Sequence, residues 1–292
     1  MNGGFVDAAQ VARRFSRVAA RYDRGDFFVR EVDRRMQERL DYVRIEPARI
    51  VDLGCSRGGS FAALGERYPG ARLVGVDAAP TMLVAGRPAR SGWQRWLGLG
   101  ERGEPARLAA DAAKLPLKSA STALVWSNLL LHWLDDPRPA LAEAHRVLEV
   151  GGLLMFSTLG PDSLKELRGA FADGYAHTQR FIDMHDLGDM LVACGFADPV
   201  MDMEVLTLTY DDFDDMLAEL RAAGSGCAMK ARRHGLTGRQ AWAKARAAYE
   251  DLRSAGKLPA TFEVVYGHAW KAQRKQTADG RAIVSLDGLR RK

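Results

Sequence analysis

The chain of 292 residues lacks any long apolar segment. No run reaches the roughly eighteen apolar residues that a membrane-spanning helix needs, and no signal-peptide pattern opens the sequence. Cysteine is scarce as well, since Cys55, Cys194 and Cys227 are scattered and form no C-x-x-C pair. We therefore expect reduced thiols and no metal site, in a cytoplasmic protein that does not associate with a membrane.

Excess charge of either sign is also modest. Lysine and arginine number 42 against 37 acidic residues, which gives a formal net charge of +5. This balance permits an acidic partner without identifying one, and we expect no nucleic acid partner. With 47% apolar residues and no internal repeat, the composition predicts one large α/β domain with additions.

The stretch at residues 50–60, which reads IVDLGCSRGGS, carries the strongest signal. Its first residues suit a buried parallel strand. The small residues after Asp52 suit a tight turn in which the backbone passes close to a ligand. A helix over residues 61–67 should follow, so the stretch predicts the strand, glycine turn and helix of a nucleotide-binding opening.

Two later segments repeat the arrangement of a strand followed by an acid. Residues 73–77 end in Asp77, and residues 107–112 contain Asp111. An acid at the end of the second strand can accept hydrogen bonds from both ribose hydroxyls of a bound nucleoside. The alternative for Asp77 is to cap the helix that follows it. Because Asp52 also closes a strand, we interpret the three acids together as a nucleoside-binding site.

This pattern resembles the class I S-adenosylmethionine-dependent methyltransferases. Their first motif is acid-x-Gly-x-Gly-x-Gly, whereas this chain has Ser56 in place of the middle glycine. A Cβ and hydroxyl there can crowd the amino-acid end of the cofactor or hydrogen-bond to it. The resemblance implies S-adenosylmethionine as methyl donor, without a metal. The cofactor-binding residues that it implies are Asp52, Gly54, Ser56, Gly58, Asp77, Ala78, Met82, Asp111, Ala112 and Asn128.

The resemblance also implies a Rossmann-like α/β fold, with a seven-stranded, mostly parallel sheet and helices on both faces. Four further segments read as strands, and the last is expected to be reversed. They are residues 123–128, 153–157, 200–210 and 261–270.

Capping signals predict where the later helices begin and end. Asp136 and Pro137 should open a helix that Gly151 and Gly152 end. Another helix should start at Gly160 and Pro161, where Ser163 and Glu166 have capping-box spacing. Asp183 should cap the helix that Gly195 closes.

We expect four regions in chain order. They are an N-terminal helical cover (residues 1–45), the cofactor-binding core (46–210), a helical lid insertion (211–257), and the last core strand with a tail (258–292).

In the N-terminal helical cover, Tyr22 and Phe15 are expected to lie over the active site. For Phe15, a role in helix packing alone explains the sequence at least as well. The Arg-rich start can also mimic a transit peptide. Residues 86–105 read as an irregular insertion, where Trp93 and Trp96 form a local core.

Several segments are similar to a narrower family, the malonyl-acyl-carrier-protein O-methyltransferases of biotin synthesis. That family esterifies the free carboxylate of a malonyl thioester, which masks the charge so that fatty-acid synthesis can extend the chain to a pimeloyl group. The similar segments are residues 11–16, 19–23, 126–129, 132–133, 158–167 and 180–181.

The chemistry of that family fits the residue types present. A carboxylate is already ionised at neutral pH, so the reaction needs no general base, and catalysis should rest on positioning in a dry pocket. The resemblance places an arginine at Arg180, which we expect to hold the carboxylate, with Arg168 as the reserve candidate. Tyr22, His132 and Trp133 should shape the pocket, although His132 reads equally well as a core histidine.

The expected lid is rich in basic residues. Between Arg221 and Lys257 there are nine lysines or arginines against Glu250 and Asp251. An acyl carrier protein is acidic, so the lid can serve as its docking surface, or it can be an ordinary solvated helical face.

Three other functions compete with this interpretation. One is the arginine-hydroxylating complex I assembly factor, which residues 164–168, 186–188 and 259–261 also resemble. Another is a methyltransferase that acts on a quinone or a similar small molecule. The third is a binding module without turnover, which Ser56 leaves open.

Overall fold

The apolar segments form one seven-stranded sheet in the computed structural model, which describes residues 4–87 and 104–273. The strand order is β3-β2-β1-β4-β5-β7-β6, with β7 antiparallel to both neighbours and the other pairings parallel. This confirms the predicted Rossmann-like class and its reversed last strand. In chain order the strands are β1 (Arg49–Leu53), β2 (Arg72–Asp77), β3 (Ala106–Ala109), β4 (Thr122–Ser127), β5 (Leu148–Leu159), β6 (Ala197–Tyr210) and β7 (Leu258–Trp270).

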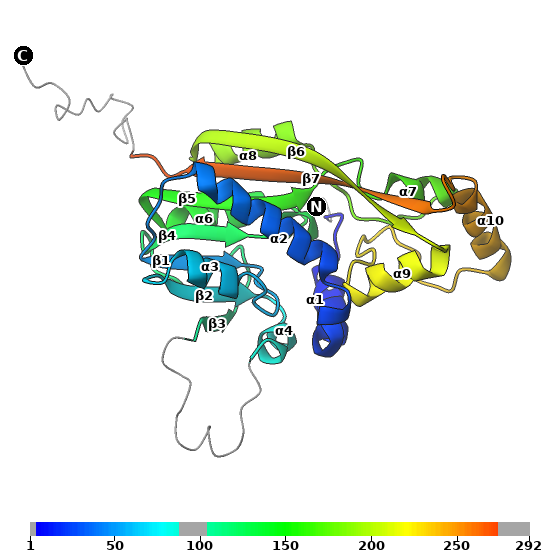
Figure 1. Ribbon diagram of the computed structural model, residues 1–292, viewed down its shortest axis with the longest axis horizontal. Coiled ribbons are helices and arrows are strands. Elements are labelled where there is room, and N and C mark those ends of the chain that lie inside the picture. The colour runs from blue at the N-terminus through cyan, green and yellow to red at the C-terminus, as the bar shows by residue number, and fades with distance from the viewer. Residues whose placement is uncertain (1–3, 88–103, 274–292) are drawn as a thin grey trace, which may run out of the picture.

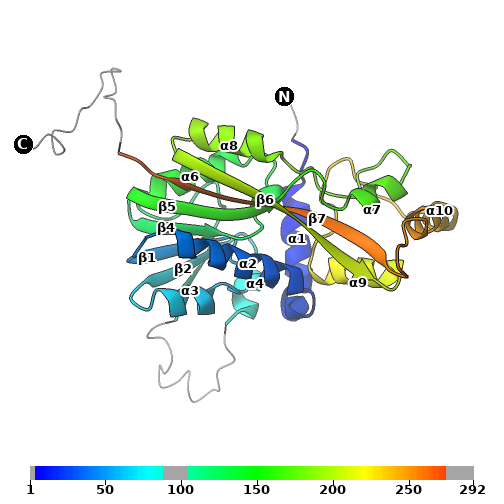
Figure 2. The same cartoon turned by 45° about the horizontal axis from the view of Figure 1, so that its top comes forward.

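Helices cover both faces of the sheet. In Figures 1 and 2, α2 and α3 lie on one face and α6 and α8 on the other. The α-helices are α1 (Ala8–Val18), α2 (Phe27–Arg39), α3 (Phe61–Arg67), α4 (Pro80–Ala85), α6 (Arg138–Val147), α7 (Lys165–Ala170), α8 (Met184–Ala193), α9 (Phe213–Ala222) and α10 (Arg239–Glu250). The short 3₁₀ helices are η1 (Ala19–Arg24), η2 (Leu40–Tyr42) and η3 (Leu131–Trp133).

The central strands are apolar on both sides because each side faces a helix layer. On β1, Ile50 belongs to the apolar cluster under α2 and α3, whereas Val51 belongs to the cluster under α6 and α8. On β4, Trp126 and Val125 divide in the same way. Successive side chains of a strand point to opposite faces, so a short apolar run serves both layers at once.

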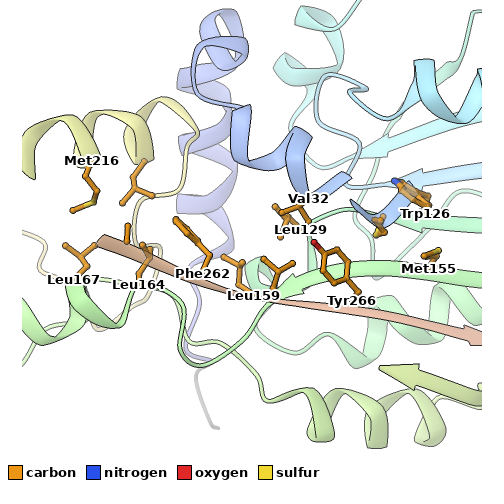
Figure 3. Packing of buried hydrophobic residues seen from close by; sticks show 14 of the residues in the cluster. Val32, Trp126, Leu129, Met155, Leu159, Leu164, Leu167, Met216, Phe262 and Tyr266 are labelled. Atoms are coloured by element: carbon orange, nitrogen blue, oxygen red, sulfur yellow. The ribbon is translucent and has the colours of Figure 1, made fainter. Parts of the chain in front are cut away.

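The first of these layers continues into the region of α7 and α9. Figure 3 follows it from Trp126 and Met155 to Leu167 and Met216, with Phe262 of β7 between them. In Figures 1 and 2, β6 and β7 run on past the parallel strands toward α7, α9 and α10. The helices between β6 and β7 therefore share a core with the sheet.

One predicted helix end is wrong. α6 stops at Val147, and β5 begins at the next residue, so Gly151 and Gly152 lie inside a strand. Both glycines pair with the residue after β7, since Gly151 N donates to the Lys271 carbonyl at 2.8 Å and Lys271 N donates to the Gly152 carbonyl at 2.9 Å. A Cβ on Gly152 would meet the Ala123 carbonyl oxygen at 3.0 Å. A glycine is needed at position 152 because neighbouring backbone comes too close for a side chain, and not because a helix ends there.

The predicted capping box is also wrong. α7 begins at Lys165, after Gly160 and Pro161, and has no side-chain cap. Ser163 and Glu166 instead fasten this segment to β7. The Ser163 hydroxyl donates to the Glu263 carbonyl at 3.1 Å, and Glu166 accepts from the backbone N–H of Thr261 at 3.1 Å. The spacing of Ser163 and Glu166 matches a capping box, but both side chains form hydrogen bonds with β7 instead.

The Asp183 cap is confirmed, since its carboxylate accepts from His185 N at 2.8 Å where α8 begins. Trp93 and Trp96 lie outside the described residues. Among the helices described, none is long and apolar enough to cross a membrane.

Candidate active site

Three residues in left-handed backbone conformation shape the turn after β1. Gly54, Ser56 and Gly58 have φ values of 78°, 52° and 87°. This region of φ is free of strain only for glycine. The turn is held against β2, because Gly54 N donates to the Val76 carbonyl at 2.8 Å. Ser56 therefore carries a backbone cost that the usual glycine avoids.

Asp77 links the turn after β1 to the start of α4, with one carboxylate oxygen for each. Its Oδ2 accepts from Ser56 N at 2.8 Å, and its Oδ1 accepts from Ala79 N at 2.7 Å at the start of α4. Asp77 is not the N-cap of α4, because that residue is Ala79 and no described side chain caps this helix. Each oxygen has a second lone pair, so Asp77 can still accept hydrogen bonds from ribose hydroxyls.

The carboxyl ends of β1, β2 and β4 open on a cavity of about 540 Å³, which is within the range of about 300–1,000 Å³ for ligand pockets. It lies where the strand order reverses, between β1 and β4, which is the usual ligand position of such sheets. We call it the main cavity. The predicted site residues that line it are Tyr22, Asp52, Gly54, Ser56, Asp77, Ala78, Asp111, Ala112, Asn128, His132 and Trp133.

Two predicted cofactor residues do not line the main cavity. Met82 is fully buried and packs with Val18 and Tyr22. At Gly58 an added Cβ would meet the Phe61 ring at 2.4 Å, so this glycine makes room for packing in the turn. Sequence spacing identified the right turn and helix but could not show which side each residue faces.

Two buried carboxylates in the cavity wall make no ion pair with any described residue. Asp52 is 2% exposed, and its Oδ2 is buried without a hydrogen-bond partner there. Asp33 of α2 accepts from the Ser60 hydroxyl at 2.6 Å and from the Trp126 indole N–H at 3.0 Å. Burial raises the pKa of Asp33, and it raises the pKa of Asp52 well above its usual value.

Asp33 was missed by the sequence interpretation. It lies on a helix before β1, outside every motif, and its only sequence signal is an acid on a helix whose neighbours Val32 and Met36 are apolar. Its buried position within the site comes from the packing of α2 on the sheet. A positively charged ligand would offset the cost of these two carboxylates.

Asn128 follows β4 and is fixed at both ends of its amide. Its Nδ2 donates to the Val29 carbonyl at 2.9 Å, and its Oδ1 accepts from the Ser157 hydroxyl at 2.7 Å. The side chain thus ties α2 and β5 together in the cavity wall. Any contact with a ligand would use its remaining lone pairs and N–H.

Aromatic rings close the cavity from the side of α1 and η1. The Phe15 ring lies 5.2 Å from Trp133 and 6.4 Å from Tyr22, and the His132 ring lies 5.2 Å from Trp133 and 6.0 Å from Phe181 (centroid distances). Phe15 both lines the cavity and packs against the cluster that contains Val18 and Tyr22. These rings make this side of the cavity apolar.

The polar atoms of this wall are neutral at physiological pH. Burial raises the pKa of Tyr22 to about 12, so its hydroxyl stays protonated. Burial lowers the pKa of His132 to about 3, and its Nδ1 lies 3.3 Å from the Thr158 hydroxyl. His132 is therefore a buried, neutral histidine rather than a charged catalyst.

Arg180, which was expected to hold the substrate carboxylate, does not line the main cavity. Its guanidinium is exposed, lies 4.5 Å from the centre of the Phe5 ring, and borders a second cavity of about 350 Å³. Arg168 borders the same second cavity. The neighbours of Arg180 on either side, Gln179 and Phe181, do line the main cavity.

Known proteins are similar to this chain in sequence and in fold. Residues 51–156 match a family model described as a methyltransferase domain. The chain is 50% identical to a malonyl-[acyl-carrier protein] O-methyltransferase of Laribacter hongkongensis, over 97% of this chain and 96% of the relative. It is 48% identical to the enzyme of the same name from Gallionella capsiferriformans, over 97% and 98%. The chain belongs to the malonyl-[acyl-carrier protein] O-methyltransferase family.

A solved structure supports the fold of this family member. The YcgJ protein of Bacillus subtilis aligns with a TM-score of 0.56 at 15% identity, covering 84% of this chain and 99% of that one. At that identity the likeness concerns the fold alone.

Proposed function

We propose that this protein methylates the free carboxylate of a malonyl group carried as a thioester on an acyl carrier protein, using S-adenosylmethionine. The observation that carries the proposal is the identity of 50% with a malonyl-[acyl-carrier protein] O-methyltransferase along nearly the whole of both chains. The main cavity adds a physical reason, since it combines an adenosine-type turn with a closed aromatic wall.

The residues of the main cavity fit the cofactor. The buried and unpartnered Oδ2 of Asp52, together with Asp33, suits the positive groups of S-adenosylmethionine. Asp77 would accept from the ribose hydroxyls, and Asp111 and Ala112 would flank the base. The cofactor supplies a methyl group activated by its sulfonium charge.

The protein's own contribution is positioning and exclusion of water. The substrate carboxylate needs no base, and in accord with this the wall offers a neutral histidine, a protonated tyrosine and the indole of Trp133. The two reactants carry opposite charges that are partly neutralised in the transition state, so a dry cavity favours transfer. Tyr22, Trp133 and Gln179 would orient the carboxylate without the strong ground-state stabilisation that a cation brings. We therefore place Arg180 on the substrate's path, outside the reacting centre.

The partner in this proposal is the carrier protein, which would dock on the basic residues of the lid. Arg221, Lys230, Arg233, Arg239 and Lys244 are all exposed there. We also propose a cytoplasmic location, since Cys55, Cys194 and Cys227 are all free thiols.

Methyl transfer can be tested with the purified protein, labelled S-adenosylmethionine and two carrier proteins. Label should pass to malonyl carrier protein and not to acetyl carrier protein, which has no free carboxylate. Equal labelling of both, or of neither, would contradict the proposed substrate. Calorimetry with the cofactor alone shows separately whether the binding half of the proposal holds.

A further inference from the structure

The second cavity and the main cavity are neighbours that share part of their lining. Thr178 and Gln179 line both cavities, so one short segment forms a wall of each. Gln179 spans this segment and residues 226–228, since its Nε2 contacts the Gly226 carbonyl and its Oε1 contacts Ala228 N, each at 3.4 Å. A ligand that reaches the main cavity past Gln179 would have its outer part in the second cavity.

The second cavity is positively charged. Arg168 and Arg180 border it, and its described lining contains no carboxylate. Arg180 makes no ion pair with any described residue, and only the Phe5 ring lies under its guanidinium. The lining His177 is paired with Asp173 at 2.8 Å, so this nearby acid already has a partner. The arginines are thus left to attract an anion from outside.

The walls of the second cavity are held in place before any ligand arrives. Arg168 donates to the Pro161 carbonyl at 2.6 Å and to the Ser163 carbonyl at 2.5 Å. His177 stacks on Phe171 with ring centres 3.7 Å apart. Ala176 N donates to the Ala231 carbonyl at 3.1 Å, which joins this wall to the segment after α9. Preorganised charge of this kind binds an anion at little cost in ordering.

The second cavity suits an anionic group of the substrate that takes no part in methyl transfer. The carboxylate loses its charge on methylation, so an arginine in contact with it would stabilise the reactant more than the transition state. Arginines outside the main cavity avoid this penalty. A carrier protein holds its acyl group on a pantetheine arm that ends in a phosphodiester, and arginine forks match phosphate oxygens well.

We propose that the second cavity binds the phosphate end of the carrier's 4′-phosphopantetheine arm, with Arg180 as its principal ligand and Arg168 as a fixed neighbouring charge. The inference rests on the proposed function for the identity of the arm. It replaces the carboxylate-binding role expected for Arg180 with a substrate-positioning role.

The test compares two small substrates, malonyl-4′-phosphopantetheine and malonyl-pantetheine, which differ only in the phosphate. The wild type should prefer the phosphorylated substrate by about 10- to 100-fold in kcat/KM, mainly through KM, since one charge-assisted contact is at stake. Arg180→Ala should abolish the preference, with kcat/KM for the phosphorylated substrate falling to the level of malonyl-pantetheine. Arg138→Ala, which removes an exposed arginine of α6 paired with Asp136, should keep the preference.

Three outcomes overturn the inference. An equal loss on both substrates in Arg180→Ala would place the guanidinium on the carboxylate. No change on either substrate would remove Arg180 from the path. Equal binding of unacylated phosphopantetheine and pantetheine to the wild type, measured by calorimetry, would contradict it without turnover. Phosphate-dependent binding without any methyl transfer would count against the proposed function alone.

Discussion

At the scale of single residues, Ser56 has a left-handed backbone conformation that is strained for serine and unstrained for glycine. Ser56→Gly should raise the free energy of unfolding by about 0.5–1 kcal/mol, partly offset by the greater freedom of glycine in the unfolded chain. Cofactor affinity should stay equal or tighten. Denaturant unfolding and calorimetry measure the two effects. Ser56→Ala keeps the strained backbone without the hydroxyl, and weaker binding in both variants would make that hydroxyl a ligand contact.

Asp33 gives a trade-off between stability and binding. Asp33→Asn keeps an oxygen for Ser60 and Trp126 but removes a buried charge, so the free protein should be equally stable or gain about 1–2 kcal/mol. Affinity for S-adenosylhomocysteine should fall about 10- to 100-fold, because its ammonium loses a carboxylate. Methylthioadenosine has no amino-acid end, so its affinity should not change. An equal loss for both ligands would show a purely structural role.

The pH dependence of Asp33 follows from its raised pKa. In the free protein, stability due to this group is greatest below the usual aspartate pKa and is lost as pH rises through the raised value. Affinity for the cofactor runs the other way, because only the ionised carboxylate attracts a cation. Wild-type affinity should therefore fall on acidification through a pKa above the usual aspartate value, and the Asp33→Asn variant should show a smaller fall.

His132 makes the protein sensitive to acid. Its pKa is about 3 in the folded state and near 6.5 when unfolded, so the stability that depends on its neutral form is present above pH 6.5 and is lost as pH falls toward 3. The loss is at most about 1.4 kcal/mol per pH unit in that window. Unfolding curves of the wild type and His132→Gln should converge as pH falls. Parallel pH profiles would contradict the burial argument.

At the scale of elements, apolar runs and the turn after β1 predicted the first strands and α3, because a strand buried on both faces has a continuous apolar run. The seven-stranded sheet and its reversed last strand were predicted from the resemblance to class I methyltransferases. Glycines and capping patterns were less reliable. Gly152 serves a close backbone approach, and Glu166 reaches Thr261 on a strand far away in sequence. Likewise, Arg180 was found by motif, but only the path of residues 175–181 shows which cavity it borders.

The basic residues between β6 and β7 offer a test of carrier docking by charge. Lys244→Glu and Arg239→Glu reverse exposed charges of α10. Each should lower kcat/KM for malonyl carrier protein about tenfold at low salt, and the difference should shrink as screening lengths fall below about 8 Å. Activity on malonyl-pantetheine, which has no protein to dock, should not change. A loss of activity that does not vary with salt would contradict docking through these charges.

At the scale of the whole molecule, two neighbouring cavities suit a substrate that is reactive at one end and charged at the other. The lining of the main cavity includes the buried carboxylates Asp33 and Asp52 and several aromatic rings, and the described lining of the second includes Arg168 and Arg180 without any carboxylate. This division places the positive groups of a cofactor and the anion of a carrier arm at separate sites. The arrangement fits transfer of a methyl group to the far end of a tethered acyl chain.

The most direct measurement is where an isotopically labelled methyl group goes. The wild-type protein is incubated with labelled S-adenosylmethionine and malonyl carrier protein, and the product is analysed by mass spectrometry and NMR. The account predicts a base-labile methyl ester on the malonyl carboxylate and an unmodified acetyl carrier control. Label at any position other than the malonyl carboxylate, or cofactor binding without any transfer, would contradict it.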